Sequence, residues 1–187
     1  MTTLAHLINS DMQKAWSFAD IARSVRGRVK GLKMKYIDQE NFRQQWTPGN
    51  VFGSHNVVAI LLTVVVPGEK RKQRHWVCLL KLKNKGASDT YQFFDSLNLE
   101  WPVLSEMLRD NGKFVQFLKK IKARPSTKQL QKEISDVRTC GAWVVCRSAF
   151  GIAYNLTNSQ FVHFILSEKG SSPDRTCIKL CALGMLT

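Results

Sequence analysis

The hydrophobic positions in the first half of the chain follow the patterns of strands. Residues 56 to 66 form a β-branched and aliphatic run that ends at a Pro-Gly pair, which predicts a buried strand. Residues 75 to 83 alternate between apolar and polar side chains at their far end, and residues 91 to 95 form a short aromatic run. Turn-forming residues separate these runs, so we expect an antiparallel meander.

Helical periodicity appears on both sides of these strands. Apolar residues recur at helical spacing over residues 1 to 22, with Ser10 or Asp11 as a capping residue. Residues 36 to 56 show no clear period, and we expect them to be irregular. Further helices are predicted at residues 101–110, 113–122, 140–150, 159–166 and 175–183. The pattern predicts an α+β fold, with a central mostly antiparallel or mixed sheet flanked by helices, in a single domain spanning residues 1–187.

The composition is that of an ordinary globular protein. The chain has 187 residues, of which 44% are hydrophobic and 22% are charged. Its longest apolar run is too short to span a membrane, and its N-terminus lacks the pattern of a secretory signal, so we expect no membrane partner. The five cysteines are an odd number and a small share of the chain, which favours reduced thiols in an intracellular protein.

The cysteine spacing gives little support for a metal site. Cys177 and Cys181 are four residues apart and would share one face of a helix. They lack a second pair of ligands at a suitable spacing, so we interpret them as small buried apolar residues and predict no metal. Cys78 lies inside an apolar strand pattern and has the same interpretation.

The clearest global feature is positive charge. Lys and Arg number 28 against 14 Asp and Glu, which gives a formal net charge of +14 and favours a polyanionic partner such as nucleic acid. Residues 23 to 35 interleave basic side chains with glycines, and they form either a phosphate-binding strip or a solvated loop or edge strand. The candidate DNA-binding residues are Arg23, Arg26, Arg28, Lys30, Lys33, Lys119 and Lys120. The last two also have a structural explanation, because positive charge is favoured at the C-terminus of a helix.

Candidate chemistry centres on Cys140, which begins a predicted helix after a polar turn. The positive end of a helix dipole lowers the pKa of a thiol and favours the nucleophilic thiolate. Such a thiol needs a histidine and a carboxylate to serve it. His75 begins one predicted strand and Asp95 ends the next, so a hairpin would bring them together. The carboxylate would then fix the imidazole tautomer and leave the other ring nitrogen for the thiol.

Each of these residues also has an ordinary structural interpretation. His75 alone is a strand-end histidine, Asp95 alone starts a turn, and Cys140 alone is a buried thiol. The joint pattern is harder to obtain by accident, because the hairpin makes the first two neighbours. Of the other histidines, His6 and His163 lie in helical patterns and are assigned to surface or packing positions. His55 precedes a strand, and a role for it in the site stays open.

The motifs around these residues resemble those of the adenain and SUMO-deconjugating protease superfamily. They are His75-Trp76 opening a strand, residues 93–97 reading Phe-Phe-Asp-Ser-Leu, and residues 139–141 reading Thr-Cys-Gly, all in the order His, Asp, Cys. The resemblance covers residues 57 to 152. It implies a papain-like architecture with a permuted triad order, and a cysteine endopeptidase in which Cys140 is the nucleophile, His75 the general base and Asp95 its orienter.

The family also has a glutamine that donates to the oxyanion, usually six or seven residues before the cysteine. Glu133 and Ile134 occupy those positions here, so this chain departs from the pattern. Gln131 is the candidate that a slightly longer loop would direct into the site, and the backbone N–H of Cys140 is the other expected donor. Without a side-chain donor, the rate would fall by about 10²–10³-fold.

The compact size and positive charge are similar to those of adenain-type viral maturation proteases. This resemblance implies a monomer that cleaves virion precursor proteins at Gly-containing sites and associates with DNA without sequence preference. It implies no cofactor beyond activation by DNA or a peptide, and a location in the virion and host nucleus, or in the nucleus or cytoplasm if the protein is cellular. The alternatives are a ubiquitin-like protein deconjugase, a non-catalytic basic nucleic-acid-binding protein and, more distantly, an acyltransferase.

Overall fold

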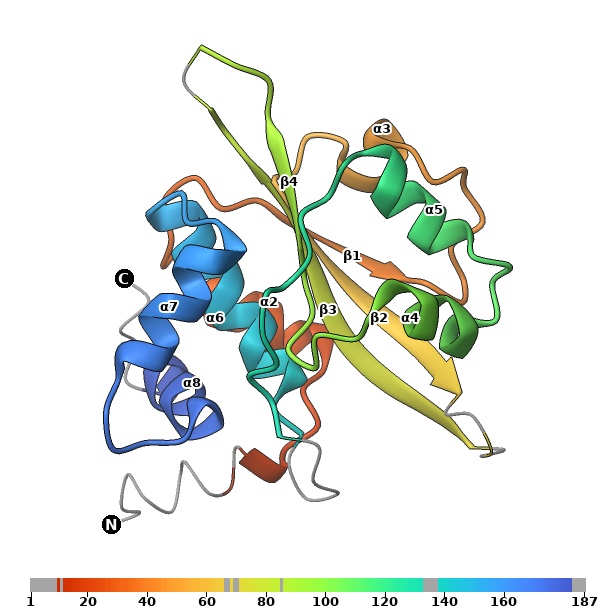
Figure 1. Cartoon of the computed structure of the whole chain (residues 1–187). Coiled ribbons are helices and arrows are strands. Elements are labelled where there is room, and N and C mark those ends of the chain that lie inside the picture. Colours follow the sequence, from red (N-terminus) through yellow and green to blue (C-terminus); the bar gives the residue numbers. More distant parts are fainter. Residues whose placement is uncertain are drawn as a thin grey trace.

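A four-stranded mixed sheet forms the centre of the molecule (Figure 1). The computed structural model describes residues 10, 12–65, 68, 71–84, 86–132 and 138–182. The strands are β1 (Met34–Asp38), β2 (Val57–Val65), β3 (Lys72–Leu82) and β4 (Thr90–Phe94), in that order across the sheet. β1 pairs with β2 in parallel, and β2–β3 and β3–β4 are antiparallel. The predicted meander is therefore confirmed, and the fold is α+β.

The segment predicted to be irregular instead contains regular structure. It includes most of β1 and the short helix α3 (Pro48–Phe52), which is capped by Thr47. β1 is an edge strand in which Ile37 alone is buried, so it lacks the alternating apolar pattern of a strand. α3 spans only 5 residues, which is too short to show a helical period. The prediction of irregular structure was wrong for these reasons.

Helices cover both faces of the sheet (Figure 1). One face packs against α2 (Phe18–Val25), α6 (Cys140–Ala153), α7 (Asn158–Ser167) and α8 (Pro173–Ala182), and the other against α3, α4 (Trp101–Leu108) and α5 (Lys113–Lys120). β3 supplies both cores, because Trp76 and Cys78 face one and Val77 and Leu79 face the other. Both faces of β3 are thus covered, which explains its nearly continuous apolar sequence.

The helix predicted over residues 1–22 is interrupted, because Ser10, Met12 and Gln13 are helical but residues 14–17 are not. α2 starts at Phe18 with a capping box, in which the Ser17 side chain accepts from the Asp20 backbone and Asp20 accepts from the Ser17 backbone. Residues 1–9 and 11 of the predicted helix, which include His6 and the predicted cap Asp11, lie outside the described residues. Residues 133–137, which include Glu133 and Ile134, also lie outside them.

The helix α6 is buried on nearly every side. Residues 141–151 are all buried, since α6 lies between β3 on one side and α2, α7 and α8 on the other. A helix that is apolar all round has to be enclosed in this way. This packing places the N-terminus of α6, with Cys140, against the central strand that carries His75.

No helix in the described part of the chain is long and apolar enough to cross a membrane.

Candidate active site

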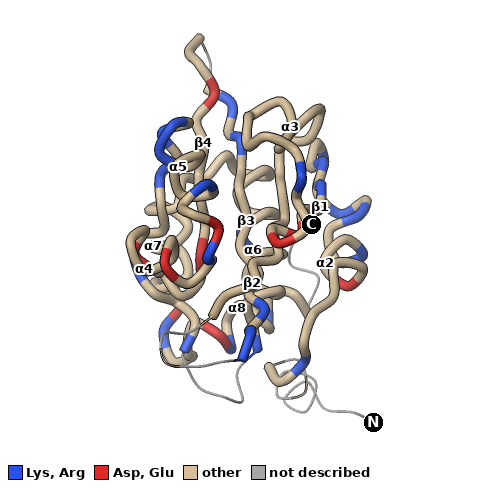
Figure 2. The backbone as a smooth tube through the Cα atoms, turned by 90° about the vertical axis from the view of Figure 1, so that its right-hand side faces the viewer, with Lys and Arg blue, Asp and Glu red and all other residues tan. Residues whose placement is uncertain are grey.

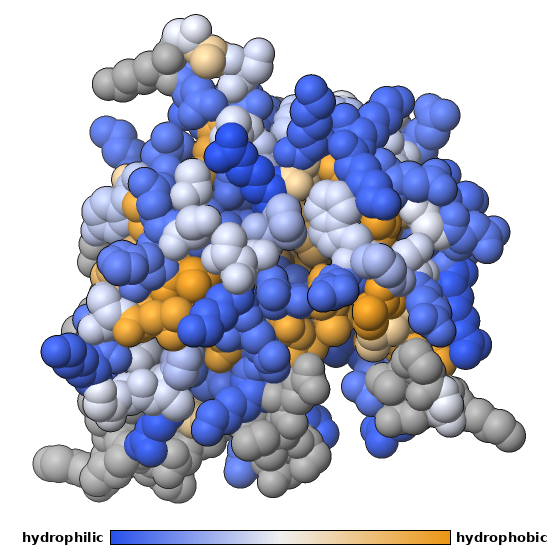
Figure 3. Space-filling model, viewed as in Figure 1, coloured by the Kyte–Doolittle hydropathy of each residue, from blue (hydrophilic) through white to orange (hydrophobic). Residues whose placement is uncertain are grey.

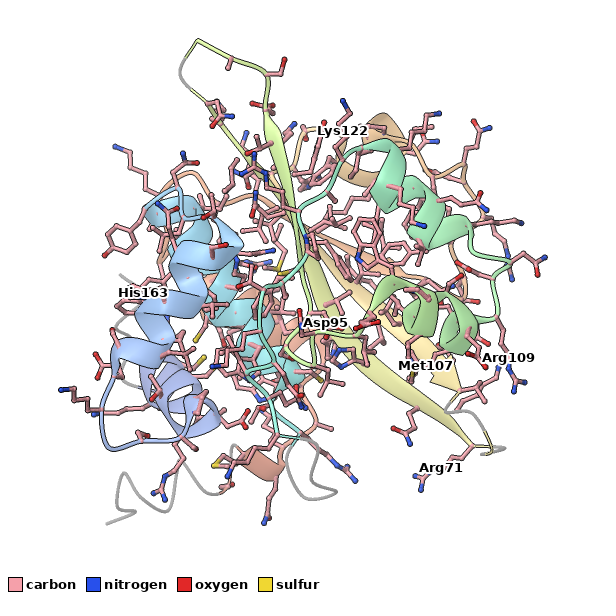
Figure 4. The ribbon with its side chains drawn as sticks, in the orientation of Figure 1. Arg71, Asp95, Met107, Arg109, Lys122 and His163 are labelled. Atoms are coloured by element: carbon pink, nitrogen blue, oxygen red, sulfur yellow. The ribbon has the colours of Figure 1, made fainter. Side chains whose placement is uncertain are left out.

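The β3–β4 hairpin brings His75 and Asp95 into contact. The register pairs Cys78 with Phe94, so the chain leaving β4 passes the strand position of His75. The His75 Nε2 and Asp95 Oδ1 atoms are 2.7 Å apart, and the two residues are only 5% and 1% exposed. Figure 4 shows Asp95 near the middle of the molecule, between the two helical layers. The predicted proximity of these two residues is therefore confirmed.

The carboxylate of Asp95 is held by its own loop. The backbone N–H groups of Leu97 and Leu99 donate to Oδ1 and Oδ2, at 2.9 and 3.1 Å, and the backbone N–H of Asp95 donates to the Ser126 hydroxyl at 2.9 Å. Burial alone would raise the pKa of Asp95, but His75 and these N–H groups lower it below its ordinary value. Asp95 is therefore a fixed, charged acceptor for the imidazole.

Cys140 meets the other side of the imidazole. Its thiol interacts with the His75 ring, and because Asp95 engages Nε2, Nδ1 is the ring nitrogen left for the thiol. Burial alone would lower the pKa of His75, but Asp95 and then Cys140 raise it to about 10. Burial alone would raise the pKa of Cys140, but His75 and the N–H groups of Trp76 and Gly141 lower it below its ordinary value. These opposite shifts favour a thiolate–imidazolium pair.

The first turn of α6 has no side-chain cap. Thr139 occupies the N-cap position, but its hydroxyl donates to Asp174 Oδ1 instead of accepting from the helix. The first intrahelical bond runs from the Trp143 N–H to the Thr139 carbonyl, so the N–H of Cys140 has no partner within the helix. An uncapped helix start beside a thiol is suited to stabilising an oxyanion.

Asp174 is a functional candidate that the sequence did not reveal. This buried residue of α8 accepts hydrogen bonds from the Thr139 hydroxyl, the Trp143 indole at 2.9 Å and the Lys132 backbone at 3.0 Å. It therefore ties α8 to the residue that precedes Cys140 and to the next turn of α6. An acidic residue in the first turn of a helix is ordinary, so its sequence position carries no signal of this role.

The segment before α2 supports the same site from another side. The Trp16 carbonyl accepts from the Trp76 indole at 2.8 Å, and the Met12 carbonyl accepts from the Arg138 N–H at 2.8 Å. A Cβ atom added to Gly141 would lie 2.3 Å from the Cβ of Trp16. Gly141 thus permits the close approach of Trp16 to the start of α6, which gives a steric reason for a glycine after the cysteine.

Gln131, the candidate oxyanion donor, lies next to the Asp95 loop. It is 7% exposed, its Oε1 atom accepts from the Ser96 hydroxyl at 2.8 Å, and its N–H donates to the Ser96 carbonyl at 3.0 Å. The next residue, Lys132, donates to Asp174, which also binds Thr139. The structure therefore brings Gln131 into the network around the triad.

A surface pocket of about 310 Å³ opens beside this loop. It is lined by Asn98, Leu99, Glu100, Trp101, Pro125 and Ser126. Leu99 and Ser126 also bind Asp95, so the wall of the pocket is continuous with the support of the triad. Apolar residues also gather across the middle of the face seen in Figure 3. Val103 of α4 and Leu166 of α7 are among the exposed large hydrophobic residues.

The predicted DNA-binding residues are exposed, but they belong to two layers. Arg23 lies in the last turn of α2, and the basic residues from Arg26 to Lys33 lie between α2 and β1. Lys119 and Lys120 end α5 on the opposite face of the sheet (Figure 2). Both groups extend towards the end of the sheet from which the β3–β4 hairpin projects, where Figure 4 labels Lys122. Arg23 has a nearby acid, because its Nη1 lies 3.8 Å from Asp20. The residues form no single strip, although they share one end of the molecule.

A scan against protein-family models and a search of curated protein sequences found no match to this chain. What can be inferred about its function therefore depends on the geometry of the site. That geometry joins a buried carboxylate, an imidazole and a thiol at a helix N-terminus, within one set of hydrogen bonds. Such an arrangement can form a nucleophilic thiolate and can protonate a leaving group.

Proposed function

We propose that the chain is a cysteine endopeptidase whose triad is Cys140, His75 and Asp95. The observation that carries the proposal is the buried imidazole of His75, which lies between the Asp95 carboxylate at 2.7 Å and the Cys140 thiol. A strand-borne histidine against a helix-borne cysteine is also what a papain-like arrangement with the order His, Asp, Cys would require. The opposite pKa shifts of Cys140 and His75 support a role as nucleophile and proton donor.

The chemistry follows from these positions. The Cys140 thiolate attacks the carbonyl carbon of the peptide bond, and the electron pair of the carbonyl moves to its oxygen. Collapse of this intermediate breaks the C–N bond, and the His75 imidazolium gives its proton to the leaving amine. His75 then takes a proton from water, which attacks the thioester and releases the carboxylate product and the free thiol. Asp95 keeps the imidazole oriented and stabilises its charge throughout.

In this proposal two groups would donate to the oxyanion. The Cys140 N–H has no partner within α6, and it lies at the positive end of the helix. Gln131 would be the second donor, since Ser96 holds its amide oxygen and its NH₂ group is the end that can donate. Removal of one such donor costs about 10²–10³-fold in kcat. Gln131→Ala should therefore lower kcat by this factor and leave Cys140 labelling nearly unchanged.

The resemblance to the adenain and SUMO-deconjugating superfamily suggests the substrate class. We take the protein to be a monomeric, DNA-associated maturation protease that cleaves virion precursor proteins at Gly-containing sites. The net charge of +14 and the basic end of the sheet support association with DNA through phosphates. In this proposal the cleavage reaction uses no cofactor, and the enzyme is activated by DNA or a peptide and acts in the virion and host nucleus.

The test uses the purified chain with Gly-containing peptides, with and without DNA. Wild type should cleave the peptide, and a peptide-like vinyl sulfone should label Cys140, as peptide mapping by mass spectrometry would show. Cys140→Ala and His75→Ala should abolish cleavage, while His163→Ala on the exposed face of α7 should not. Equal cleavage, or equal absence of cleavage, in wild type and both triad variants would contradict the proposal.

The same experiment separates the alternatives. A deconjugase should react with a ubiquitin-like vinyl sulfone probe and hardly with short peptides. A non-catalytic DNA-binding protein should bind DNA equally well with and without Cys140→Ala and should cleave nothing.

A further inference from the structure

Three cysteines meet where α8 packs on α6. Cys177 and Cys181 lie one turn apart on α8, and Cys146 faces them from α6. The Cys146 sulfur is 3.4 Å from the sulfur of Cys177 and 3.4 Å from that of Cys181, and the three sulfurs lie within 4.8 Å of one another. The sequence suggested only the pair on α8, because the third cysteine is distant along the chain.

The burial of this cluster differs between its members. Cys146 and Cys177 are fully buried, while Cys181 is partly exposed and marks the side from which an ion could enter. All three are thiols and not disulfides. Burial raises the pKa of Cys146 and Cys177 well above the ordinary value.

The geometry matches that of a trithiolate site. Zinc–sulfur bonds are about 2.3 Å long, so three sulfurs around one ion lie about 3.8–4.0 Å apart. The sulfurs here are within a few tenths of an ångström of that spacing on two sides of the triangle. A disulfide would use two of the three sulfurs and would leave the third without a role, whereas a thiophilic cation uses all three. Thiolates are the ligands that select zinc and copper(I).

We propose that Cys146, Cys177 and Cys181 bind a thiophilic d¹⁰ cation, either Zn²⁺ with a water molecule as fourth ligand or Cu⁺ with the three sulfurs alone. Binding exchanges the thiol protons for metal–sulfur bonds and changes no oxidation state. The ion ties α6 to α8 one turn beyond Asp174, the residue that holds Thr139 and Trp143. The site does not depend on whether Cys140 is catalytic.

The experiment uses the full chain with Cys140→Ala, so that the triad thiol cannot bind the ion. The protein is reduced, kept without oxygen, and loaded with Zn²⁺ or with Cu⁺ in separate samples. After buffer exchange, elemental analysis by mass spectrometry should find about one ion per chain, and the loaded protein should unfold at a higher temperature. Competition with chelators of known affinity then shows which of the two ions the site prefers.

Variants of Cys181, the partly exposed thiol, test whether the cluster is where the ion binds. Cys181→Ser and Cys181→Ala should each weaken ion binding by about 10–100-fold or more, since this is the loss expected even for a residue that only supports a ligand. Cys78→Ala is the matched control, because it removes a buried cysteine from β3 that is not in the cluster, and it should bind the ion as before.

A second readout needs no ligand variant. The bound ion should slow alkylation of Cys181 in the Cys140→Ala chain, and mass spectrometry of the labelled peptides measures this directly. Failure to retain either ion, unchanged binding after Cys181→Ala, or equal alkylation with and without ion would each overturn the proposal.

Discussion

Cys140 and Cys146 belong to the same helix, yet their thiols have opposite acidity. Cys140 is partly buried and pairs with His75, which lowers its pKa below the ordinary value. Cys146 is buried among other thiols, and burial together with Cys181 raises its pKa well above that value. The same residue type on one helix therefore has a lowered pKa at one end and a raised pKa further along. The partner, more than the helix, decides which form is present.

Removing the partner should erase this difference and has the largest expected effect. In His75→Ala, Cys140 loses the group that most lowers its pKa, so its thiolate fraction at neutral pH falls. Peptide cleavage should drop by about 10⁴-fold or more. The pH dependence of iodoacetamide labelling at Cys140 measures the shift directly and should move to higher pH. His163→Ala should leave the labelling curve where it is, and an unmoved curve in His75→Ala would show that the ion pair is not what activates Cys140.

The next effect concerns the pH range of activity. The reactive ion pair exists above the lowered pKa of Cys140 and below the pKa of His75, which is about 10. Activity should therefore rise at a pH below the ordinary thiol pKa and fall as pH passes about 10. Asp95→Asn removes the main group that raises the His75 pKa, so the falling limb should move to lower pH and kcat should drop by about 10²–10⁴-fold.

The ion pair of His75 and Asp95 also predicts that the stability of the fold depends on pH. The folded-state pKa of His75 lies above its reference value of 6.5, so its pairing stabilises the fold fully below that pH and is lost as pH rises through about 10. Asp95 has a lowered pKa, so its contribution is present above its reference value of 3.8 and is lost as pH falls through the lowered value. Denaturant unfolding across pH should show both limbs in wild type, and Asp95→Asn should flatten them.

A smaller effect is expected where α8 holds the start of α6. Asp174→Asn keeps the shape of the side chain but replaces a charged acceptor of buried donors, which should cost about 1–3 kcal/mol of unfolding free energy. Because His75 is untouched, the pH midpoint of Cys140 labelling should stay close to that of wild type. Asp89→Asn on an exposed loop is the control and should change neither quantity. A midpoint that moves as far as in His75→Ala would assign Asp174 to the triad itself.

Close packing at the start of α6 gives a comparable effect on stability alone. In Gly141→Ala the new methyl group meets the Cβ of Trp16, and relief of the overlap should cost about 1–3 kcal/mol. Gly49→Ala is the control, because a Cβ there meets nothing within 4 Å. Calorimetry should show a lower melting temperature for Gly141→Ala only. Equal melting temperatures would mean that the segment carrying Trp16 can move away without loss.

The smallest effect should come from the basic end of the sheet. Lys30→Gln with Lys33→Gln should lower the slope of log affinity against log salt for DNA by about 2, at roughly 0.9 for each lost phosphate contact. Arg71→Gln with Lys128→Gln removes the same charge elsewhere on the exposed surface and serves as the control. Cys140 labelling should be identical in both pairs. Equal slopes would assign the attraction to net charge and not to this surface.

The fold was largely predictable because its main elements are local patterns. The strands β2 to β4 and the helices α4 to α8 lie where apolar periodicity places them, within a few residues. β1 and α3 were not predicted, because β1 is a half-exposed edge strand and α3 is too short to show a helical period. Short or singly covered elements take their structure from tertiary contacts, which a local pattern does not contain.

The sequence by itself determined the hairpin, the helix start and hence the meeting of His75 with Asp95, because antiparallel pairing fixes which strand positions are neighbours. Only the tertiary structure decided the rest. Several contacts join residues that no spacing along the chain relates. They are Met12 with Arg138, Thr139 with Asp174, and the cysteines of α6 with those of α8. The acidity of each thiol also depends on those contacts, because a pKa follows burial and neighbouring charge in three dimensions.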